Sequence, residues 1–384
     1  MKRAARPLAL LCALASLSLG SVAAPLPAAG VPVMPIRPVE GLAIDPPPEL
    51  GAITWILYDE TYNLVLASEG ADIERPMAST TKVMTGIIAL ENSDPDQTVL
   101  VSERAAEIGE AAVGLVVGES LELGPLTTGL LVRSGNDAAI ALAEGVSGTV
   151  EAFVEQMNDK AAELGLEHTR FANPHGLDEP GHYSTASDLL EMTRAAMDIP
   201  EFAGAVAAKV YRFPPEPDGS SRVVENTNLM LWSYEGTIGG KTGFTFDAGL
   251  VLSVVAERDG RRLYAVVMGS EGENAHFEDA SALLDYGFES FGVVPLIIEG
   301  TSYGLLRSGD EEAPLLAAGT VEAFVHIAAA GVLAPELALV EGDPVLVVGE
   351  EEESQVAVVT GDQAPLPDTG DALNWFQRWL GGER

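Results

Sequence analysis

The sequence predicts a layered α+β domain over residues 49–292, followed by a small β-rich domain over residues 293–360. The chain has 384 residues, which is long for one average domain and short for three. In the first region, strand-like segments stand at both ends and helix-like segments lie between them, which favours one sheet covered by helices. After about Val293, short Val, Leu and Ile runs alternate with Gly- and Glu-rich turns, which is typical of β structure.

The first strands and helix are expected directly after a proline-rich stretch. Residues 24–48 are rich in Pro, Ala and Val, and we expect them to form an extended linker. The apolar run at residues 52–57 predicts a buried strand, and residues 64–67 are expected to pair with it in a hairpin. From Ser79 onward, apolar residues recur at helical spacing, which predicts a helix.

Later segments complete the first domain. Asp137–Val146 and Thr149–Leu164 are predicted helices, and the second of them places its apolar residues on one face. Strands are predicted at Gly249–Glu257 and Arg262–Gly269, which a tight turn joins. A last helix is expected at Phe277–Phe288. The sheet would therefore receive strands from both ends of the domain.

Residues 361–384 are expected to form a linker and a C-terminal amphipathic helix. Projected at helical spacing, the apolar residues of the tail fall within an arc of about 160°. They are Leu373, Trp375, Phe376, Trp379 and Leu380. Aromatic-rich amphipathic helices lie in membrane interfaces, so the membrane surface is an expected partner. A helix docked on its own protein is the alternative. The Glu350–Glu353 run, upstream, is expected to be a solvated turn.

The chain is strongly acidic. It carries 58 acidic and 21 basic residues, for a formal net charge of -37. Such a surface repels nucleic acid, so we exclude nucleic acid as a partner. Both a salty habitat and an ordinary acidic secreted protein fit this composition.

Residues 1–23 are expected to be a secretory signal peptide. Three basic residues precede an apolar stretch at residues 8–19, which is too short to span a bilayer comfortably. Small residues up to Ala23 offer a cleavage site, and a retained N-terminal anchor is the alternative. The only cysteine, Cys12, lies in this segment, so the mature protein would have no disulfide and no thiolate chemistry. We expect export to the periplasm or to the outer face of a bacterial cytoplasmic membrane.

Ser79 and Lys82, in Ala-Ser-Thr-Thr-Lys, are the first candidates for catalysis. A serine hydroxyl is a weak nucleophile and needs a neighbouring base. Three residues apart on a helix, the two side chains share a face, so the amine can reach the hydroxyl. Lysine acts as a base only if burial or a second cation lowers its pKa. Taken alone, the pair is better explained by a helix-capping serine and a surface lysine.

Two further motifs carry polar groups, the first on a predicted turn and the second at a predicted strand edge. In Ser134-Gly135-Asn136, the hydroxyl could pass a proton to a leaving group and the amide could hold a substrate amide. Lys241-Thr242-Gly243 stands directly before Phe244-Thr245. A strand edge at this place could bind an extended peptide as an added strand. Lys241 and Thr242 would bind a carboxylate, and Gly243 would let the substrate backbone approach closely. Each motif alone is also an ordinary turn.

Together the motifs form the ordered set Ser-x-x-Lys, Ser-x-Asn and Lys-Thr-Gly, which is typical of β-lactamases and penicillin-binding proteins. Over about residues 50–292 the sequence resembles the serine-type D-alanyl-D-alanine carboxypeptidases, low-molecular-mass penicillin-binding proteins of the SxxK peptidase type. The resemblance also covers residues 75–85, 173–177, 182–186 and 240–245. It implies an α/β (α+β) penicillin-binding domain with a mostly antiparallel sheet, a small β domain and a C-terminal anchor.

The resemblance also implies roles for single residues. Ser79 would attack the D-Ala-D-Ala bond of peptidoglycan stem peptides and become acylated, while Lys82 takes its proton. Ser134 and Lys241 would form the proton path to the departing D-alanine, and Asn136 would position the peptide. Acylation by β-lactam antibiotics and a part in cell-wall remodelling and cell shape are implied as well.

Phe244 and His276 complete the implied site. The oxyanion would sit between the backbone N–H groups of Ser79 and Phe244. His276 stands where related sequences often carry an arginine that helps to hold the terminal carboxylate. A neutral imidazole is a poorer carboxylate partner than arginine. Either Lys241 and Thr242 suffice, or turnover of D-Ala-D-Ala termini is weak.

No metal or cofactor is expected. The other histidines, at 168, 175, 182 and 326, lack the paired spacing of metal ligands, and no glycine-rich phosphate loop is present. The alternatives within the same fold are a D,D-endopeptidase and a β-lactamase. Some β-lactamases activate water with Glu-x-x-Leu-Asn, but no Leu-Asn pair occurs between Asp137 and Gly240. The alternative from another class is a non-catalytic cell-wall scaffold.

Overall fold

The computed structural model describes residues 45–215, 220–308, 311–318, 320–327, 336–340, 343–347 and 355–360. The expected signal peptide, most of the expected linker before residue 49, the Glu350–Glu353 run and the C-terminal segment 361–384 lie outside the described residues. Across the described ranges, no helix is long and apolar enough to cross a membrane.

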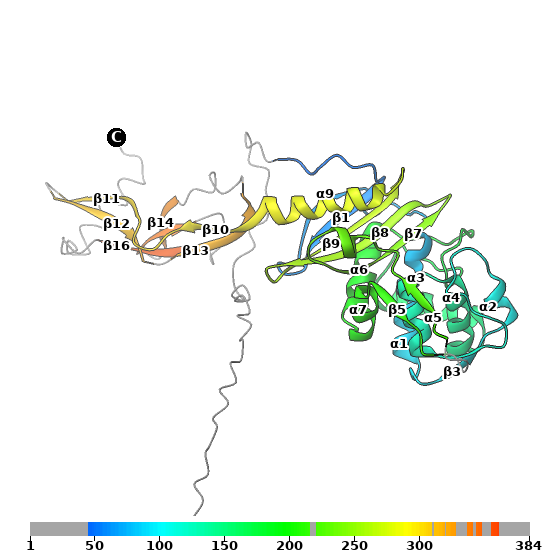
Figure 1. Ribbon diagram of the computed structural model, residues 1–384. Coiled ribbons are helices and arrows are strands. Elements are labelled where there is room, and N and C mark those ends of the chain that lie inside the picture. The colour runs from blue at the N-terminus through cyan, green and yellow to red at the C-terminus, as the bar shows by residue number, and fades with distance from the viewer. Residues whose placement is uncertain are drawn as a thin grey trace, which may run out of the picture.

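A five-stranded antiparallel sheet forms the centre of the protein (Figure 1). Its strand order is β2-β1-β9-β8-β7. The strands are β1 (Thr54–Asp59), β2 (Leu64–Glu69), β7 (Thr237–Thr245), β8 (Gly249–Arg258) and β9 (Arg261–Ser270). The sheet combines strands from the two ends of the first domain, so the α+β prediction with an antiparallel sheet is confirmed. It leaves β7, which carries Lys241, at an edge.

Side chains from the sheet enter two cores, one on each face. In β1, Ile56 and Tyr58 belong to the larger core, whereas Trp55 and Leu57 belong to the smaller one. This division follows from the alternation of side chains along a strand. The smaller core lies beneath α9 (Ala275–Ser290), and Figure 1 shows α9 running along this side of the sheet.

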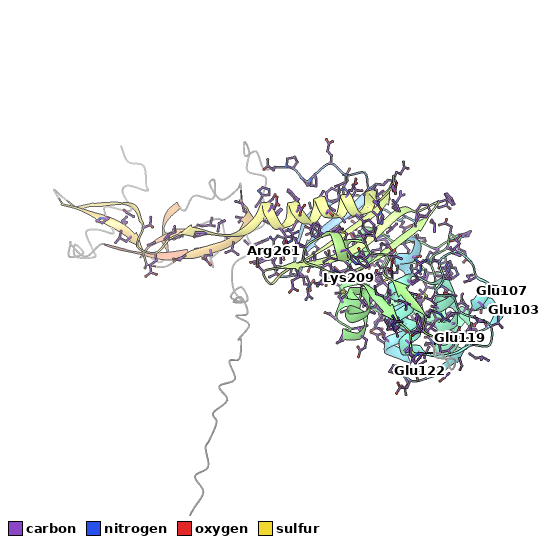
Figure 2. All side chains as sticks on the ribbon, in the orientation of Figure 1. Glu103, Glu107, Glu119, Glu122, Lys209 and Arg261 are labelled. Carbon is purple, nitrogen blue, oxygen red and sulfur yellow. The ribbon has the colours of Figure 1, made fainter. Side chains whose placement is uncertain are left out.

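The larger core lies between the sheet and a group of helices on its other side (Figure 1). These elements are the 3-10 turn η1 (Ala78–Thr81), α1 (Lys82–Asn92), α2 (Glu103–Glu107), α3 (Leu123–Arg133), α4 (Asn136–Ser147), α5 (Val150–Glu163), α6 (Ala186–Met197) and α7 (Pro200–Ala207). A four-residue helix, α8 (Met230–Ser233), and two small hairpins, β3 (Thr98–Leu100) with β4 (Ser120–Glu122) and β5 (Val210–Arg212) with β6 (Val223–Glu225), complete this part. Acidic side chains of α2 and β4 line its outer edge, as the labels in Figure 2 show.

The predicted helices at 137–146, 149–164 and 277–288 are confirmed as α4, α5 and α9. The helix expected from Ser79 differs at its start, because the chain first makes the 3-10 turn η1 and becomes α-helical only at Lys82. Sequence reasoning named neither α3 nor α6. Both are central to the site, since Ser134 caps the C-terminal end of α3 and α6 follows the His182 loop.

Beyond α9 the chain becomes β-rich, as predicted. β10 (Phe291–Ile297) pairs with β13 (Val321–His326). A separate five-stranded sheet has the order β11 (Ser302–Ser308), β12 (Glu311–Ala317), β16 (Gln355–Thr360), β15 (Asp343–Val347) and β14 (Glu336–Val340). Phe291 and Phe324 pack into the smaller core, and Phe324 stacks on Tyr62 with 3.7 Å between ring centroids. The first β-pair is therefore attached to the sheet side that α9 covers.

Candidate active site

Ser79 lies in the 3-10 turn that leads into α1. Side chains three residues apart line up along a 3-10 helix, and Lys82 Nζ donates a hydrogen bond to Ser79 Oγ over 2.9 Å. The turn thus achieves the contact that a regular helix was expected to give. Ser79 itself is partly exposed, whereas Lys82 is fully buried. The nucleophile candidate can therefore meet a substrate while its partner stays out of water.

Lys82 is held by three acceptors. Besides Ser79 Oγ, its Nζ contacts Asn136 Oδ1 at 2.8 Å and the His175 carbonyl oxygen at 2.5 Å. Asn136 Nδ2 donates to the Gly109 carbonyl, which fixes the amide with its oxygen toward the lysine. The carbonyl and the amide oxygen can only accept. A neutral amine would therefore donate both of its hydrogens to them and direct its lone pair at the Ser79 hydroxyl.

The neutral amine is favoured by its surroundings. Burial lowers the pKa of Lys82 well below the ordinary lysine value, and the nearby positive charge of Lys241 lowers it further. The carboxylates of Asp137 and Glu110 act in the opposite direction, but more weakly. Because a lysine base must lose its proton near neutral pH, this pKa shift is the one that the chemistry requires.

Ser134 and Lys241 form a second pair across the site. Lys241 Nζ donates to Ser134 Oγ over 2.8 Å and to the Thr242 carbonyl over 2.9 Å. Burial lowers the pKa of Lys241 to about 7. Ser134 ends α3 in the left-handed conformation, with φ 67° and ψ 32°, which a non-glycine residue adopts only when its surroundings hold it there. The fold thus aims the Ser134 hydroxyl at a lysine on the edge strand.

Asp137, which sequence reasoning treated only as the start of a helix, anchors the loop over this pair. Its carboxylate accepts the backbone N–H groups of Val113, Gly114 and Leu115 at 2.9–3.0 Å. A Cβ atom at Gly135 would lie 2.5 Å from Asp137 Oδ1, so the middle residue of Ser-Gly-Asn must be glycine. In the sequence, the acidic residue that directly follows Ser-Gly-Asn is the signal that could have identified this anchor.

A buried hydrogen-bond chain supports the residue before Ser79. The Ala172 N–H donates to His182 Nδ1 over 3.0 Å, which leaves the proton on Nε2. Nε2 then donates to Thr81 Oγ1 over 2.7 Å, and the Thr81 hydroxyl donates to the Ala78 carbonyl over 2.7 Å. Ala78 has a φ of 47°, so this chain holds a strained residue. Burial lowers the pKa of His182 to about 4, which keeps its ring neutral.

Glycines let three segments meet at Ser79. A Cβ at Gly243 would lie 2.9 Å from the Ser79 nitrogen, and a Cβ at Gly176 would lie 2.0 Å from the Ala78 carbonyl oxygen. Gly243 was expected to admit the substrate backbone, and the structure adds that the protein's own Ser79 turn approaches it. This brings the Ser79 backbone close to β7, on which Phe244 is the next residue.

Thr242 and His276 have different surroundings. Thr242 Oγ1 shares a hydrogen bond of 2.7 Å with Thr227 Oγ1 beside Lys241. His276 lies in the first turn of α9, where its buried ring packs against Phe277 with 3.9 Å between ring centroids and an interplanar angle of 34°. Burial lowers the pKa of His276 to about 4, so it is neutral at neutral pH. The nearby Asp279 carboxylate acts in the opposite direction on this pKa, and Nδ1 of His276 has no hydrogen-bond partner among the described residues. The role of His276 toward a carboxylate stays a prediction.

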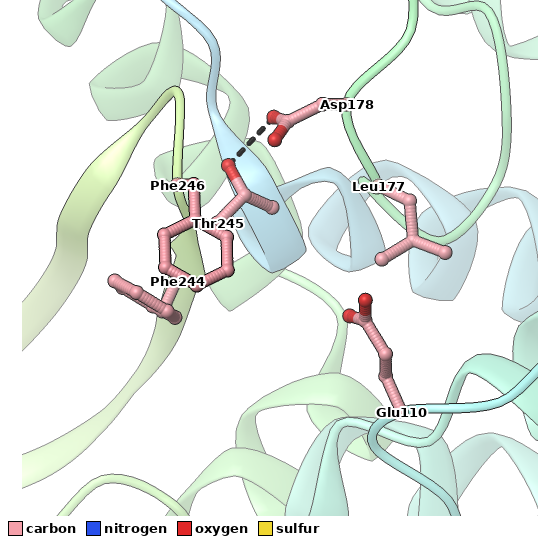
Figure 3. A pocket seen from close by; sticks show the side chains of 6 residues that line it. All are labelled: Glu110, Leu177, Asp178, Phe244, Thr245 and Phe246. Atoms are coloured by element: carbon pink, nitrogen blue, oxygen red, sulfur yellow. Dashed lines mark hydrogen bonds between the residues drawn. The ribbon is translucent and has the colours of Figure 1, made fainter.

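A cavity of about 340 Å³ opens next to Phe244 (Figure 3). It is lined by Glu110, Leu177, Asp178, Phe244, Thr245 and Phe246. Thr245 Oγ1 donates to Asp178 Oδ1 over 2.6 Å, so the end of the edge strand is tied to the loop after His175. Within the described part of the chain, no three acids, histidines or cysteines gather in a way that could hold a metal ion.

Comparison with known proteins agrees with this geometry. Residues 42–272 match the Peptidase_S11 family, described as D-alanyl-D-alanine carboxypeptidase. The chain is 36% identical over 281 residues to the D-alanyl-D-alanine carboxypeptidase DacD of Escherichia coli (strain K12), which covers 69% of this chain and 71% of that protein.

Two solved structures have a similar fold. The D-alanyl-D-alanine carboxypeptidase from Mycobacterium tuberculosis H37Rv has a TM-score of 0.61 and 37% sequence identity, over 64% of this chain and 94% of that chain. The Streptomyces K15 DD-transpeptidase has a TM-score of 0.61 and 31% identity, over 63% of this chain and 99% of that chain.

Proposed function

The chain belongs to the Peptidase_S11 family of D-alanyl-D-alanine carboxypeptidases, and we propose that it uses Ser79 to remove the terminal D-alanine from peptidoglycan stem peptides. It is a serine peptidase of the penicillin-binding fold. The observation that supports the residue assignment best is the set of acceptors around Lys82, because it leaves one amine lone pair for the Ser79 hydroxyl.

Acylation begins with proton transfer from Ser79 Oγ to the neutral amine of Lys82. The oxygen bonds to the carbonyl carbon of the penultimate D-alanine, and the backbone N–H groups of Ser79 and Phe244 stabilise the oxyanion. The C–N bond then breaks. The departing amine takes a proton from Ser134 Oγ, and Lys241 Nζ resupplies that oxygen over 2.8 Å. Water hydrolyses the resulting Ser79 ester and releases the shortened peptide.

Substrate recognition would use the edge strand. We place the peptide beside β7, with its terminal carboxylate at Lys241 and Thr242 and its amide near Asn136. His276 would contribute to the carboxylate site from α9. Because burial lowers the pKa of Lys241 to about 7, its positive charge, and with it carboxylate binding, should weaken as the pH rises above about 7.

A pentapeptide stem tests this function. The purified protein is expected to release one D-alanine per peptide, and Ser79→Ala is expected to release none. Glu103→Gln, on the exposed surface of α2, is the control variant. Asn158→Asp is unsuitable as a control, because the Asn158 side chain donates hydrogen bonds to two backbone carbonyls. Cleavage of a cross-linked dimer of stem peptides, without release of D-alanine from the pentapeptide, would favour the endopeptidase alternative. Absence of both reactions would favour the scaffold.

Penicillin turnover distinguishes the β-lactamase alternative. We propose a long-lived penicilloyl ester on Ser79, since no Leu-Asn pair of the kind used in one water-activating device occurs between Asp137 and Gly240. Rapid appearance of hydrolysed penicillin at many equivalents per enzyme would contradict this proposal.

We also propose that the protein is exported, acts in cell-wall remodelling and cell shape, and attaches peripherally to the membrane through residues 361–384. The aromatic amphipathic pattern of the tail supports attachment. Removal of residues 371–384 should move the protein from the membrane fraction to the soluble fraction. A truncated protein that remains in the membrane pellet would end the attachment proposal.

A further inference from the structure

We propose that Thr227 is a positioning residue for the terminal carboxylate of the substrate. Its hydroxyl donates a hydrogen bond to Thr242 Oγ1 and thereby directs the hydroxyl hydrogen of Thr242 at the carboxylate. This inference rests on the proposed function, because it needs a peptide at Ser79 whose carboxylate lies at Thr242. The sequence motifs give no sign of this role, since Thr227 lies outside all three of them.

The chemistry of the two hydroxyls sets the direction of this hydrogen bond. Thr227 Oγ1 and Thr242 Oγ1 are 2.7 Å apart, and either could be the donor in the free protein. Each hydroxyl carries one hydrogen and two acceptor lone pairs, whereas a carboxylate can only accept. When Thr242 donates its hydrogen to the carboxylate, the hydrogen between the two threonines must therefore come from Thr227. Both side chains are partly exposed, so a ligand can reach the pair.

The hydrogen bond from Thr227 also makes Thr242 a better donor. Chains of hydrogen bonds polarise one another, so a hydroxyl that accepts a hydrogen bond donates its own hydrogen more strongly. The same bond holds the Thr242 side chain in one rotamer about its Cα–Cβ bond. Without the Thr227 hydroxyl, Thr242 would donate more weakly and from a less defined position, and the carboxylate would bind less tightly.

The backbone around Thr227 is held independently of its hydroxyl. Thr227 lies between β6 and α8, and its N–H donates to the Val132 carbonyl near the end of α3 over 3.2 Å. The buried side chain of Asn226 donates to the Ala208 carbonyl over 2.9 Å. Asn228 is also buried, and its N–H donates to Asn226 Oδ1 over 2.9 Å. Loss of the Thr227 hydroxyl should therefore leave this segment in place.

The other groups assigned to the carboxylate site increase the importance of the Thr242 hydroxyl. Lys241 Nζ already donates to Ser134 Oγ over 2.8 Å and to the Thr242 carbonyl over 2.9 Å, so two of the three hydrogens of the protonated amine are engaged. His276 is buried, and burial lowers its pKa to about 4, which keeps its ring neutral. A neutral imidazole is a poorer partner for a carboxylate than an arginine. Carboxylate binding therefore depends strongly on the direction of the Thr242 hydroxyl.

The test compares two substrates that share one acyl part, of which only the first has the carboxylate. They are Nα,Nε-diacetyl-L-lysyl-D-alanyl-D-alanine and the thiobenzyl ester of Nα,Nε-diacetyl-L-lysyl-D-alanine. The measured quantity is kcat/KM for the first substrate divided by kcat/KM for the second. Thr227→Val keeps the shape of the side chain and removes the hydroxyl. It should lower this ratio by about threefold to tenfold, chiefly through a higher KM for the carboxylate substrate.

Further variants connect the ratio to the hydroxyl pair. Thr227→Ser keeps the hydroxyl and should restore most of the wild-type ratio. Thr242→Val should lower the ratio at least as much as Thr227→Val does, and the double variant should show no further fall, because Thr227 acts through Thr242. Thr237→Val is the matched control, since it removes from the same strand a hydroxyl that donates to the Tyr234 carbonyl over 3.0 Å. It should leave the ratio unchanged.

Failure of this inference can be told apart from failure of the proposed function. If the wild-type protein releases no D-alanine from the peptide, the proposed function is wrong and the role of Thr227 falls with it. If the wild type releases D-alanine but Thr227→Val keeps the wild-type ratio, the function stands and the role of Thr227 is overturned. The role is also overturned if the falls caused by the two single valine variants multiply in the double variant.

Discussion

Replacement of His182 by glutamine tests how a buried, neutral ring supports the turn that carries Ser79. His182 is 5% exposed and bridges the Ala172 N–H and Thr81 Oγ1. A proton on Nδ1 would remove the acceptor for Ala172, so protonation is unfavourable in the folded protein. Glutamine keeps an N–H donor for Thr81 but cannot titrate.

The size of the effect follows from the pKa of His182 in the two states. The pKa is lowered from 6.5 to about 4 on folding, so the unfolded chain binds a proton more tightly than the folded protein does. Stability from this group is fully present above the unfolded pKa and is lost as the pH falls from about 6.5 toward about 4. Linkage gives a loss of about 2 kcal/mol at about pH 5 relative to about pH 8.

The assay is urea unfolding followed by tryptophan fluorescence, with wild type and His182→Gln compared at a series of pH values. Other titrating groups change both proteins alike, so the difference between their unfolding free energies isolates His182. The unfolding free energy of the wild type minus that of His182→Gln should fall by about 2 kcal/mol between about pH 8 and about pH 5. The lower pH stays above the isoelectric point of about 4.2, which limits precipitation. A difference that is independent of pH would refute the reasoning.

Three further predictions concern the site. Lys241→Gln removes a charge that lowers the pKa of Lys82, so the acid limb of penicillin acylation, where the rate rises with pH as Lys82 becomes neutral, should move to higher pH. Gly176→Ala places a Cβ 2.0 Å from a backbone carbonyl oxygen, at φ +91°, and should reduce the free energy of unfolding by more than about 2 kcal/mol. Gly148→Ala, at φ +78° but with open space around the added Cβ, should reduce it by about 1 kcal/mol. His276→Arg should raise kcat/KM for a stem peptide ending in D-Ala-D-Ala.

Each of these predictions has an outcome that contradicts it. An acid limb that stays in place or moves to lower pH would show that Lys241 does not lower the pKa of Lys82. Equal destabilisation by the two glycine replacements, measured by urea unfolding, would show that the turn at Gly176 can relax. An unchanged or lower kcat/KM for His276→Arg would show that the buried start of α9 does not reach the carboxylate.

The strands of the central sheet could be predicted because burial on both faces produces uninterrupted apolar runs. β1, β8 and β9 show this pattern, and the helices α4, α5 and α9 show helical spacing. α3 could not be recognised in the same way, since its eleven residues include two glycines and a proline. A Cβ at Gly129 would lie 2.2 Å from the Phe213 ring, so packing rather than helix propensity determines this helix.

The motif spacing identified the chemical groups of the site but not what holds them. Ser79 and Lys82 are three residues apart, so their contact could be predicted from local geometry. The His175 carbonyl reaches Lys82 from 93 residues along the chain, and no local pattern announces such a contact. The same holds for Glu110 and Asp178, which are far apart in the sequence and line one cavity at the end of the edge strand.

Mass spectrometry of the protein after incubation with benzylpenicillin tests the Ser79–Lys82 site most directly. We predict one penicilloyl group per chain, located on the peptide that contains Ser79, with no adduct on Ser79→Ala and strongly slowed formation on Lys82→Gln. An unmodified wild-type protein, or an adduct on any other residue, would contradict the assignment of Ser79 as the nucleophile.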